Sequence, residues 1–433
     1  MTLALIGFAI LLALSFAGLP LGFLTLIVGL GGFAYTRDWD WHAALTMMSQ
    51  QIMETGASYG LSVIPLFLLM GVFIHRSNIS EDLFEAAYAL MGKYRGGLAQ
   101  STVLACAGFA AVSGSSLATA ATMTKVAMPH MRRYRYDDAL SSGVIAAGGT
   151  LGIMIPPSVP LVIYGVVAEE DIGKLFIAGI LPGLLLVILF MLAVTVVVRR
   201  RPEAGAAGEE LPRHERIRAY LNVWPVVALF MVILGGIYAG VFTPTEAAGI
   251  GATGAAAFAL YRGRLRTVRE WVDSLIDACQ TTGALFIVIF GAQVFANFIN
   301  LSGLPNDLVD LVEAMNLSPM GVVIAVCVIC ILMGMIFEAV GILLLIVPVF
   351  LPTLISMDVN LIWFGIVMVL VVELGLITPP IGMNVFTVRT VMPDIELAKI
   401  FRGVTPFVIA DLIALVLLLA FPMIAIGLVG LMR

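Results

Sequence analysis

Residues 148–160 read Gly-Gly-Thr-Leu-Gly-Ile-Met-Ile-Pro-Pro-Ser-Val-Pro, inside a run of apolar residues that is otherwise typical of a membrane-spanning helix. Pro156 and Pro157 have no backbone N–H, so carbonyl groups about one turn upstream lose their partners, and the glycines add backbone freedom. The stretch therefore predicts a broken helix. In a bilayer, broken backbone is tolerated only where protein or a water-filled cavity surrounds it, so the break indicates a binding site.

A second stretch repeats this pattern in the other half of the chain. Residues 373–384 read Glu-Leu-Gly-Leu-Ile-Thr-Pro-Pro-Ile-Gly-Met-Asn, and in both stretches three residues separate Leu-Gly from Pro-Pro. A shift of 223 positions places Pro156 on Pro379. An internal repeat that contains a broken helix in each copy is the signature of secondary transporters.

The composition is that of a membrane protein. Of the 433 residues, 61% are hydrophobic and only 12% are charged, and the mean hydropathy is +1.07. These values exclude an ordinary soluble domain, and no basic surface favours nucleic acid as a partner. The four cysteines lie in or beside apolar segments, so no disulfide framework is predicted.

Each half also contains an apolar stretch that is interrupted near its middle. Residues 98–130 are interrupted at Ser113-Gly114-Ser115-Ser116, and residues 320–353 form the equivalent stretch in the second half. The arms have only about a dozen residues, whereas a span needs about 20. We therefore expect two re-entrant helical hairpins whose tips face the broken spans 137–167 and 361–391.

The positive charges predict the orientation. When the spans are threaded in order, Arg37, Lys174 and Arg433 alone fall on the side opposite to the arginine-rich loops, while Lys125 lies within a hairpin arm and is expected to extend toward its cytoplasmic end. The arginine-rich side is therefore predicted to be cytoplasmic, and the N-terminus periplasmic. The two hairpins then enter from opposite sides of the membrane.

The predicted fold is an all-α polytopic membrane protein with inverted structural repeats, each containing a re-entrant hairpin and a broken transmembrane helix. The predicted regions are N-terminal scaffold helices with an interfacial arm (1–58), the first repeat (59–198), a linker (199–220) whose residues 199–218 form a cytoplasmic loop, scaffold helices with a second interfacial arm (221–280), the second repeat (281–403) and a C-terminal span (404–433).

Hairpin tips that face broken helices bring helix ends and free carbonyl groups together at the membrane midplane. Helix N-termini attract anions, and free carbonyls coordinate sodium. The candidate sodium-binding residues are Ser113, Gly114, Ser115, Gly149, Gly152, Pro156, Gly334, Glu338, Glu373, Gly375, Thr378, Pro379 and Gly382. The candidate substrate-binding residues are Ser115, Ser116, Thr150, Ser158, Gly341 and Asn384.

Two alternative interpretations remain open for these residues. Small residues also allow membrane helices to pack closely. Glu338 and Glu373 are costly in mid-membrane and are therefore functional candidates, but a carboxylate that accepts backbone hydrogen bonds could instead hold a hairpin closed. No metal-binding or catalytic motif accompanies them, so sodium is the only ion and no organic cofactor is expected.

Four stretches resemble one protein family. They are residues 108–122 (Gly-Phe-Ala-Ala-Val-Ser-Gly-Ser-Ser-Leu-Ala-Thr-Ala-Ala-Thr), 148–158, 242–248 (Phe-Thr-Pro-Thr-Glu-Ala-Ala) and 378–384 (Thr-Pro-Pro-Ile-Gly-Met-Asn). Together they are similar to the large membrane subunit of tripartite ATP-independent periplasmic (TRAP) transporters, of the ion-transporter superfamily. The resemblance covers essentially the whole chain. We interpret residues 242–248 as a structural turn of the scaffold.

This resemblance implies a sodium-driven, elevator-type permease of the bacterial inner membrane. Its implied partners are a small four-helix membrane subunit on a separate chain and a periplasmic substrate-binding protein, and its implied substrates are small organic acids such as C4-dicarboxylates, sialic acid or other sugar acids. A stand-alone sodium/dicarboxylate symporter of the same superfamily is the nearest alternative. An intramembrane enzyme that uses Glu338 and Glu373 as an acid pair is a more distant one, because no nucleophile faces them, and a channel fits two closed tips poorly.

Overall fold

The computed structural model describes residues 2–432, which form helices and no strands. The helices are α1 (Thr2–Phe16), α2 (Leu21–Thr36), α3 (Trp41–Gly56), η1 (Tyr59–Ser62), α4 (Val63–Arg76), α5 (Ile79–Met91), α6 (Gly97–Ser113), α7 (Ser116–Arg133), α8 (Asp138–Met154), α9 (Val159–Val167), α10 (Ile172–Arg200), η2 (Pro202–Ala204), α11 (Arg213–Tyr238), α12 (Pro244–Tyr261), α13 (Val268–Leu301), α14 (Leu304–Ala314), α15 (Pro319–Gly334), α16 (Ala339–Ser356), α17 (Leu361–Leu376), α18 (Met383–Val391), α19 (Leu397–Ala420), α20 (Met423–Ile426) and η3 (Val429–Leu431). In this part of the chain six helices are long and apolar enough to cross a membrane, and the bent pair α8–α9 makes a seventh candidate.

Helix pairs lie where both hairpins and both breaks are predicted. The hairpin arms have 16 to 18 residues rather than about a dozen, and α16 is one of the six candidate spans, so re-entry into the membrane stays a prediction. The first hairpin is α6 and α7, and the second is α15 and α16. The first broken span is α8 and α9, which are bent by 41° around Pro156-Pro157. The second is α17 and α18, which are separated by residues 377–382. The prolines and glycines of the two stretches thus end the helices where a missing N–H predicts it.

The helix bounds also repeat along the chain. Shifting α7 by 223 residues gives 339–356, which are the bounds of α16, and shifting α8 gives 361–377, one residue longer than α17. The order of elements from α3 to α10 thus recurs from α13 to α19. The opposite orientation of the two halves in the membrane stays a prediction.

The interfacial arm of the second half differs from its counterpart. In the first half α3 ends at Gly56 and α4 begins at Val63, whereas α13 runs without interruption and contains the predicted boundary at residue 280. Residues 56–62 contain two glycines, whereas the equivalent residues 279–285 contain one glycine and no proline, so fewer residues there favour a helix end.

Two other region boundaries predicted from the sequence also differ from the ends of the helices. Helices α10 and α11 extend into the predicted 199–220 linker from both ends, which leaves residues 201–212 as the connection. The predicted boundary at residue 403 lies inside α19. Charged side chains at Arg199, Arg200 and Arg213 do not end a helix by themselves, because long basic side chains have good helix propensity.

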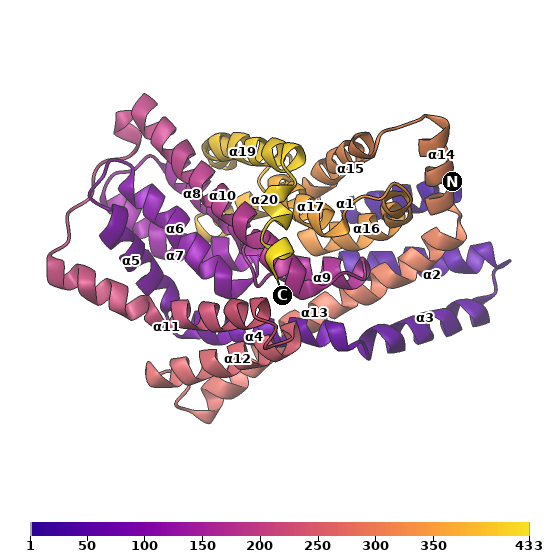
Figure 1. The fold of residues 1–433 in the computed structure, drawn as a ribbon, viewed down its shortest axis with the longest axis horizontal. Helices are drawn as coiled ribbons and strands as arrows, with labels where there is room; N and C mark the ends of the chain where they lie inside the picture. Colours follow the sequence, from indigo (N-terminus) through magenta and orange to yellow (C-terminus); the bar gives the residue numbers. More distant parts are fainter. Residues whose placement is uncertain (1, 433) are drawn as a thin grey trace.

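The helices pack as two interlocked halves beside a group of scaffold helices. In Figure 1, α3, α4, α11 and α12 lie along the lower side, with the hairpins and broken spans above them. Helix α4 packs against α12 and α13, and α2 runs along α13. The halves cross over: α18 of the second break packs against α7 of the first hairpin, and α9 of the first break packs against α16 of the second hairpin.

Candidate functional site

The first hairpin tip touches the first broken span through backbone atoms. Gly114 has a positive φ of +59°, and a methyl group added to it would lie 3.1 Å from the Pro157 carbonyl oxygen. A methyl group at Gly152 would lie 2.6 Å from the Ser115 carbonyl oxygen, and one at Gly149 would lie 3.1 Å from that of Ser116. Only glycine therefore permits this approach, which brings the first predicted group of residues together.

Hydroxyl groups organise this tip. The Thr119 hydroxyl donates to the Ser115 carbonyl oxygen at 2.7 Å, so it accepts the hydrogen bond that joins it to the Ser113 hydroxyl at 2.8 Å. The Ser115 side chain caps the start of α7 by accepting from the Ala118 N–H. The tip thus presents several oxygen atoms beside the carbonyl groups of the first break. Oxygen atoms of this kind are the ligands that alkali cations use.

The second hairpin end contacts the second break in the same way. A methyl group at Gly375 would lie 2.5 Å from the Gly334 Cα atom, so α15 and α17 meet backbone to backbone. In the break, Gly382 has a φ of +64°, and the Thr378 hydroxyl donates to the Leu374 carbonyl at 2.6 Å. Glu338 is the N-cap residue of α16, and its side chain makes no capping hydrogen bond.

Two further side chains form hydrogen bonds at the breaks. The Ser158 hydroxyl donates to the Ile153 carbonyl at 2.5 Å, across the first break. The Asn384 amide, from the start of α18, donates to the Ala146 carbonyl of α8 at 3.1 Å. Asn384 is fully buried, and its Oδ1 atom has no hydrogen-bond partner among residues 2–432. These contacts join the second break to the first broken span.

A cavity of about 550 Å³ lies between the hairpin tips and helices α4 and α13. It is lined at one end by Ser113–Ser116 and Glu338, and at the other by His75, Arg76 and Lys125. Most of its remaining lining is apolar. An apolar cavity with a few convergent polar groups is the usual form of a small-molecule site.

The cations in this cavity differ in their pairing. The Arg76 guanidinium lies 2.5 Å from the Asp277 carboxylate, so its charge is compensated within the protein. The exposed Lys125 ammonium group forms no ion pair in the part of the chain that the structure describes. The cavity therefore offers one uncompensated positive charge to an anion. The sequence predicts that Lys125 extends toward the cytoplasmic end of its arm but does not associate it with a cavity.

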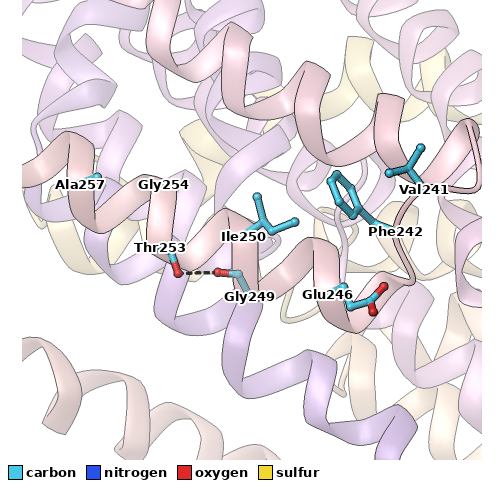
Figure 2. A pocket seen from close by; sticks show the side chains of 8 residues that line it. All are labelled: Val241, Phe242, Glu246, Gly249, Ile250, Thr253, Gly254 and Ala257. Atoms are coloured by element: carbon cyan, nitrogen blue, oxygen red, sulfur yellow. Dashed lines mark hydrogen bonds between the residues drawn. The ribbon is translucent and has the colours of Figure 1, made fainter.

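A second, wider groove over α12 has different chemistry. Figure 2 shows that it is lined by α12 and the turn before it, with Gly249, Thr253 and Ala257 along one face. The Thr253 hydroxyl is satisfied by the Gly249 carbonyl at 2.9 Å. Glu246 accepts from the Thr243 N–H at 2.8 Å in a capping box. The predicted structural turn therefore covers only residues 242 and 243, because α12 begins at Pro244, and the exposed Glu246 carboxylate lies in the groove.

Ion pairs hold the hairpin and the broken span together at one end of the molecule. Arg132, at the end of α7, pairs with Asp394 in the connection before α19 and lies 3.5 Å from the Asp138 carboxylate at the start of α8. The hydrogen bond from the Arg132 guanidinium lowers the pKa of Asp394 below its ordinary value. The Lys399 ammonium group adds a contact to Asp138 at 3.4 Å.

The predicted residues thus separate into four places. Those that line the cavity are Ser113, Gly114, Ser115, Ser116 and Glu338. Those that lie at hairpin-to-break contacts or within a break are Gly149, Gly152, Pro156, Ser158, Gly334, Gly375, Thr378, Pro379, Gly382 and Asn384. Gly341 packs against Leu21 of α2, and Thr150 and Glu373 are fully buried.

Asp411 is the residue that sequence reasoning missed in this interior group. It stands in Phe-Val-Ile-Ala-Asp-Leu-Ile-Ala-Leu, residues 407–415 of α19, and it is fully buried. The rule that identified Glu373, that a mid-membrane carboxylate is a functional candidate, applies equally to Asp411. The signal was therefore present in an apolar span that carried no break.

Two hairpins that meet two broken helices, beside a cavity with a free cation, define a membrane transporter. The description "Tripartite ATP-independent periplasmic transporter, DctM component" matches residues 5–424 of the chain. The chain therefore belongs to the TRAP large permease family. It is a multi-pass membrane transporter subunit and not an enzyme.

Characterised relatives agree with this membership. The chain is 36% identical over 378 residues to the C4-dicarboxylate TRAP transporter large permease protein of Pseudomonas aeruginosa, which covers 87% of this chain and 88% of the relative. It is 30% identical to the sialic acid large permease of Vibrio cholerae, over 95% of each chain. It is 31% identical to the ectoine large permease of Halomonas elongata, over 98% of this chain and 96% of the relative.

Two solved structures share the fold. The Alcanivorax borkumensis YdaH transporter has a TM-score of 0.63 and 14% sequence identity, over 88% of each chain. The Neisseria gonorrhoeae MtrF protein has a TM-score of 0.61 and 15% identity, over 89% of this chain and 85% of the other. Their identity is low, so the likeness concerns the arrangement of helices alone.

Proposed function

We propose that this subunit imports a small organic acid together with sodium across the bacterial inner membrane, by an elevator mechanism. The observation that carries the proposal is the contact of a serine-rich hairpin tip with a broken span on one side and, on the other, with a cavity that contains the unpaired Lys125. The hairpins and broken spans would move as one transport unit past α4 and α13.

The sodium sites are proposed at the two hairpin-to-break contacts. At the first, the Ser115 and Pro157 carbonyl groups and the Ser113 hydroxyl lie close together. At the second, Glu338 adds a carboxylate near the end of α15, and the break beyond Gly375 supplies carbonyl groups. Binding at both places would join hairpin to broken span and so permit movement as a rigid unit.

The substrate is proposed to be a carboxylate. Lys125 supplies an uncompensated positive charge, and Ser115 and Ser116 supply hydroxyl groups at the opposite end of the cavity. The names of the relatives include C4-dicarboxylate, sialic acid and ectoine, all of which carry at least one carboxyl group. A site that pairs one lysine with several hydroxyls suits this shared group.

The partners are proposed from the family. The name tripartite indicates two further components, which we take to be a separate small four-helix membrane subunit and a periplasmic binding protein. The N-terminus would then be periplasmic and the 199–218 loop cytoplasmic. A stand-alone symporter is the second candidate, and uptake by this chain alone in liposomes would favour it.

Sodium replacement in proteoliposomes tests the coupling. The chain is reconstituted with its small subunit and binding protein, and uptake of labelled acid is measured with an inward gradient of either sodium or potassium. We expect uptake with sodium only. Equal uptake with potassium would contradict sodium coupling.

Serine variants test the first site. We expect Ser115→Ala with Ser116→Ala to raise the sodium concentration that gives half-maximal uptake. Ser141→Ala with Ser142→Ala is the matched control, because those hydroxyls donate within α8 to the Asp137 and Asp138 carbonyls at 3.0 Å and 2.6 Å. If both double variants changed this sodium concentration equally, the hydroxyl groups of the tip would not be part of the sodium site.

A further inference from the structure

The connection between α10 and α11 is held against the first hairpin along part of its length. Two loops bound this hairpin, residues 92–96 before α6 and residues 134–137 after α7. Residues 204–209 of the connection, which we call the strap, contact both loops. Ala204 and Gly205 are buried, although charged residues stand on both sides of the strap. The strap is therefore packed against the hairpin rather than free in solution.

Backbone hydrogen bonds join the strap to both loops. The Asp137 N–H, from the loop after α7, donates to the Ala204 carbonyl oxygen at 3.0 Å. The Gly96 N–H, from the loop before α6, donates to the Gly205 carbonyl oxygen at 3.2 Å. Two neighbouring residues of the strap thus contact the two opposite ends of the hairpin, so the strap ties the start of the hairpin to its end.

The later residues of the strap continue along the loop before α6. The Gly208 N–H donates to the Gly92 carbonyl oxygen at 2.9 Å, and the Glu209 N–H donates to the Tyr88 hydroxyl oxygen at 2.9 Å. A methyl group added to Gly208 would lie 2.8 Å from the same Gly92 oxygen. The two backbones therefore approach each other at a distance that requires glycine in the strap.

One buried tyrosine links the strap to the hairpin a second time. The Tyr136 hydroxyl donates to the Ala206 carbonyl oxygen at 2.6 Å and accepts from the Leu98 N–H at 3.2 Å. Leu98 is the second residue of α6, where a backbone N–H has no partner within its own helix. The side chain thus joins the loop after α7, the first turn of α6 and the strap.

The rest of the connection, residues 210–212, is held differently. The N–H groups of Glu210 and Leu211 donate no hydrogen bond in the described part of the chain. The Glu210 carboxylate lies 3.3 Å from Lys93 and 3.5 Å from Arg216, but all three side chains are accessible to solvent, where ion pairs contribute little. A cavity of about 540 Å³ lies between α5, α7, the connection and α11. This short segment is therefore the weakly held part.

We propose that the strap is a structural part of the first hairpin, which closes its base, and that residues 210–212 are the joint between the hairpin and α11. The hydrogen bonds of the strap keep the ends of α6 and α7 together, so the two arms move as one body. Movement at the joint rests on the proposed elevator mechanism. Closure of the hairpin base does not.

Hydrogen–deuterium exchange of the whole subunit in lipid nanodiscs, resolved to single residues, tests the strap. Backbone N–H groups in stable hydrogen bonds exchange slowly. After correction for the effect of neighbouring side chains, we expect the amides of Asp137, Gly208 and Glu209 to exchange at least about tenfold more slowly than those of Glu210 and Leu211. Equal rates in the two groups would contradict a strap that is held on the hairpin.

Insertion of Gly-Ser-Gly at two places separates the strap from the joint. Between Ala206 and Ala207 the insertion displaces the strap from its loops, so we expect a lower melting temperature and fast exchange at Gly208. Between Leu211 and Pro212 the same insertion should leave the melting temperature and the slow exchange unchanged. Equal effects of the two insertions would contradict the division into strap and joint.

A disulfide tests whether the strap and the hairpin base move together. Arg95 and Ala207 are exposed and face each other in an isolated antiparallel bridge, whose Cα atoms lie about 4.5–5.5 Å apart, within the range that a disulfide spans. With Cys279→Ser, which removes the exposed native cysteine, Arg95→Cys with Ala207→Cys should crosslink under mild oxidation and keep the uptake of the reduced protein.

Loss of uptake on crosslinking would show that the strap moves relative to the hairpin base, and would overturn the proposal. Exchange and melting are measured without transport, so failure of the elevator mechanism or of sodium coupling changes neither result. The two proposals can therefore fail separately.

Discussion

At the scale of single residues, the cations that line the cavity differ in whether a carboxylate compensates their charge. Lys125 and Arg76 line the same cavity, but only Arg76 has its charge compensated by a neighbouring carboxylate. Removing the lysine charge should therefore weaken binding of an anionic substrate, whereas removing a charge elsewhere on the surface should not.

We expect Lys125→Gln to raise the KM for the transported acid by at least about tenfold, because a charge-assisted hydrogen bond contributes roughly 1.5–3 kcal/mol. Lys125→Arg should restore part of the affinity, since the charge is kept. Lys93→Gln is the matched control, because its ammonium group pairs at the surface with Glu210 at 3.3 Å. The dependence of uptake on acid concentration gives the KM of each variant. Similar KM values for the two glutamine variants would show that Lys125 does not bind the substrate.

At the scale of elements, glycine contacts determine how closely helices approach. Helices α8 and α19 cross where Gly143 meets Gly403, and a methyl group at Gly143 would lie 2.2 Å from the Gly403 carbonyl carbon. Backbone atoms cannot move aside as a flexible side chain can. This crossing therefore depends on the absence of a Cβ atom.

We expect Gly143→Ala to destabilise the protein by about 1–3 kcal/mol, through overpacking. Gly249→Ala in α12 is the control, because no atom lies within 4 Å of the added methyl group. That substitution should stabilise the helix by roughly 0.5–1 kcal/mol through its propensity. Melting temperatures in the same detergent measure both, and a more stable Gly143→Ala would contradict the backbone contact.

The hairpins and breaks could be predicted because their causes are local. A Pro-Pro pair removes two N–H groups wherever it stands, and the polar Ser113–Ser116 stretch interrupts an apolar run, although the arms have 16 to 18 residues and not about a dozen. The position of Lys125 in the cavity depends on how helices distant in sequence pack. No local pattern encodes that packing, so the sequence predicts the lysine without its cavity.

At the scale of the whole molecule, α4 lies against the first hairpin tip. A methyl group at Gly71 would lie 3.4 Å from the Ser113 carbonyl oxygen and 3.7 Å from its Cα atom. If the tip moves past α4 during transport, this contact must break in each cycle. A covalent bond at this place should therefore arrest the protein.

We expect Gly71→Cys with Ser113→Cys to form a disulfide under mild oxidation and to lose uptake, with recovery after reduction. The background carries Cys279→Ser, since Cys279 is the exposed one of the four native cysteines. Each single cysteine variant should keep its uptake in oxidant. Undiminished uptake by the fully crosslinked protein would contradict movement of the tip relative to α4.

The uninterrupted α13 gives the two halves different mechanics. Its 34 residues extend about 51 Å at 1.5 Å per residue, well beyond a hydrocarbon core of about 30 Å. In the first half, the corresponding segment is divided into α3 and α4, which are separated by the residues between Gly56 and Val63. If the hairpins and broken spans move during transport, bending should concentrate in residues 57–62, because α13 contains no such interruption.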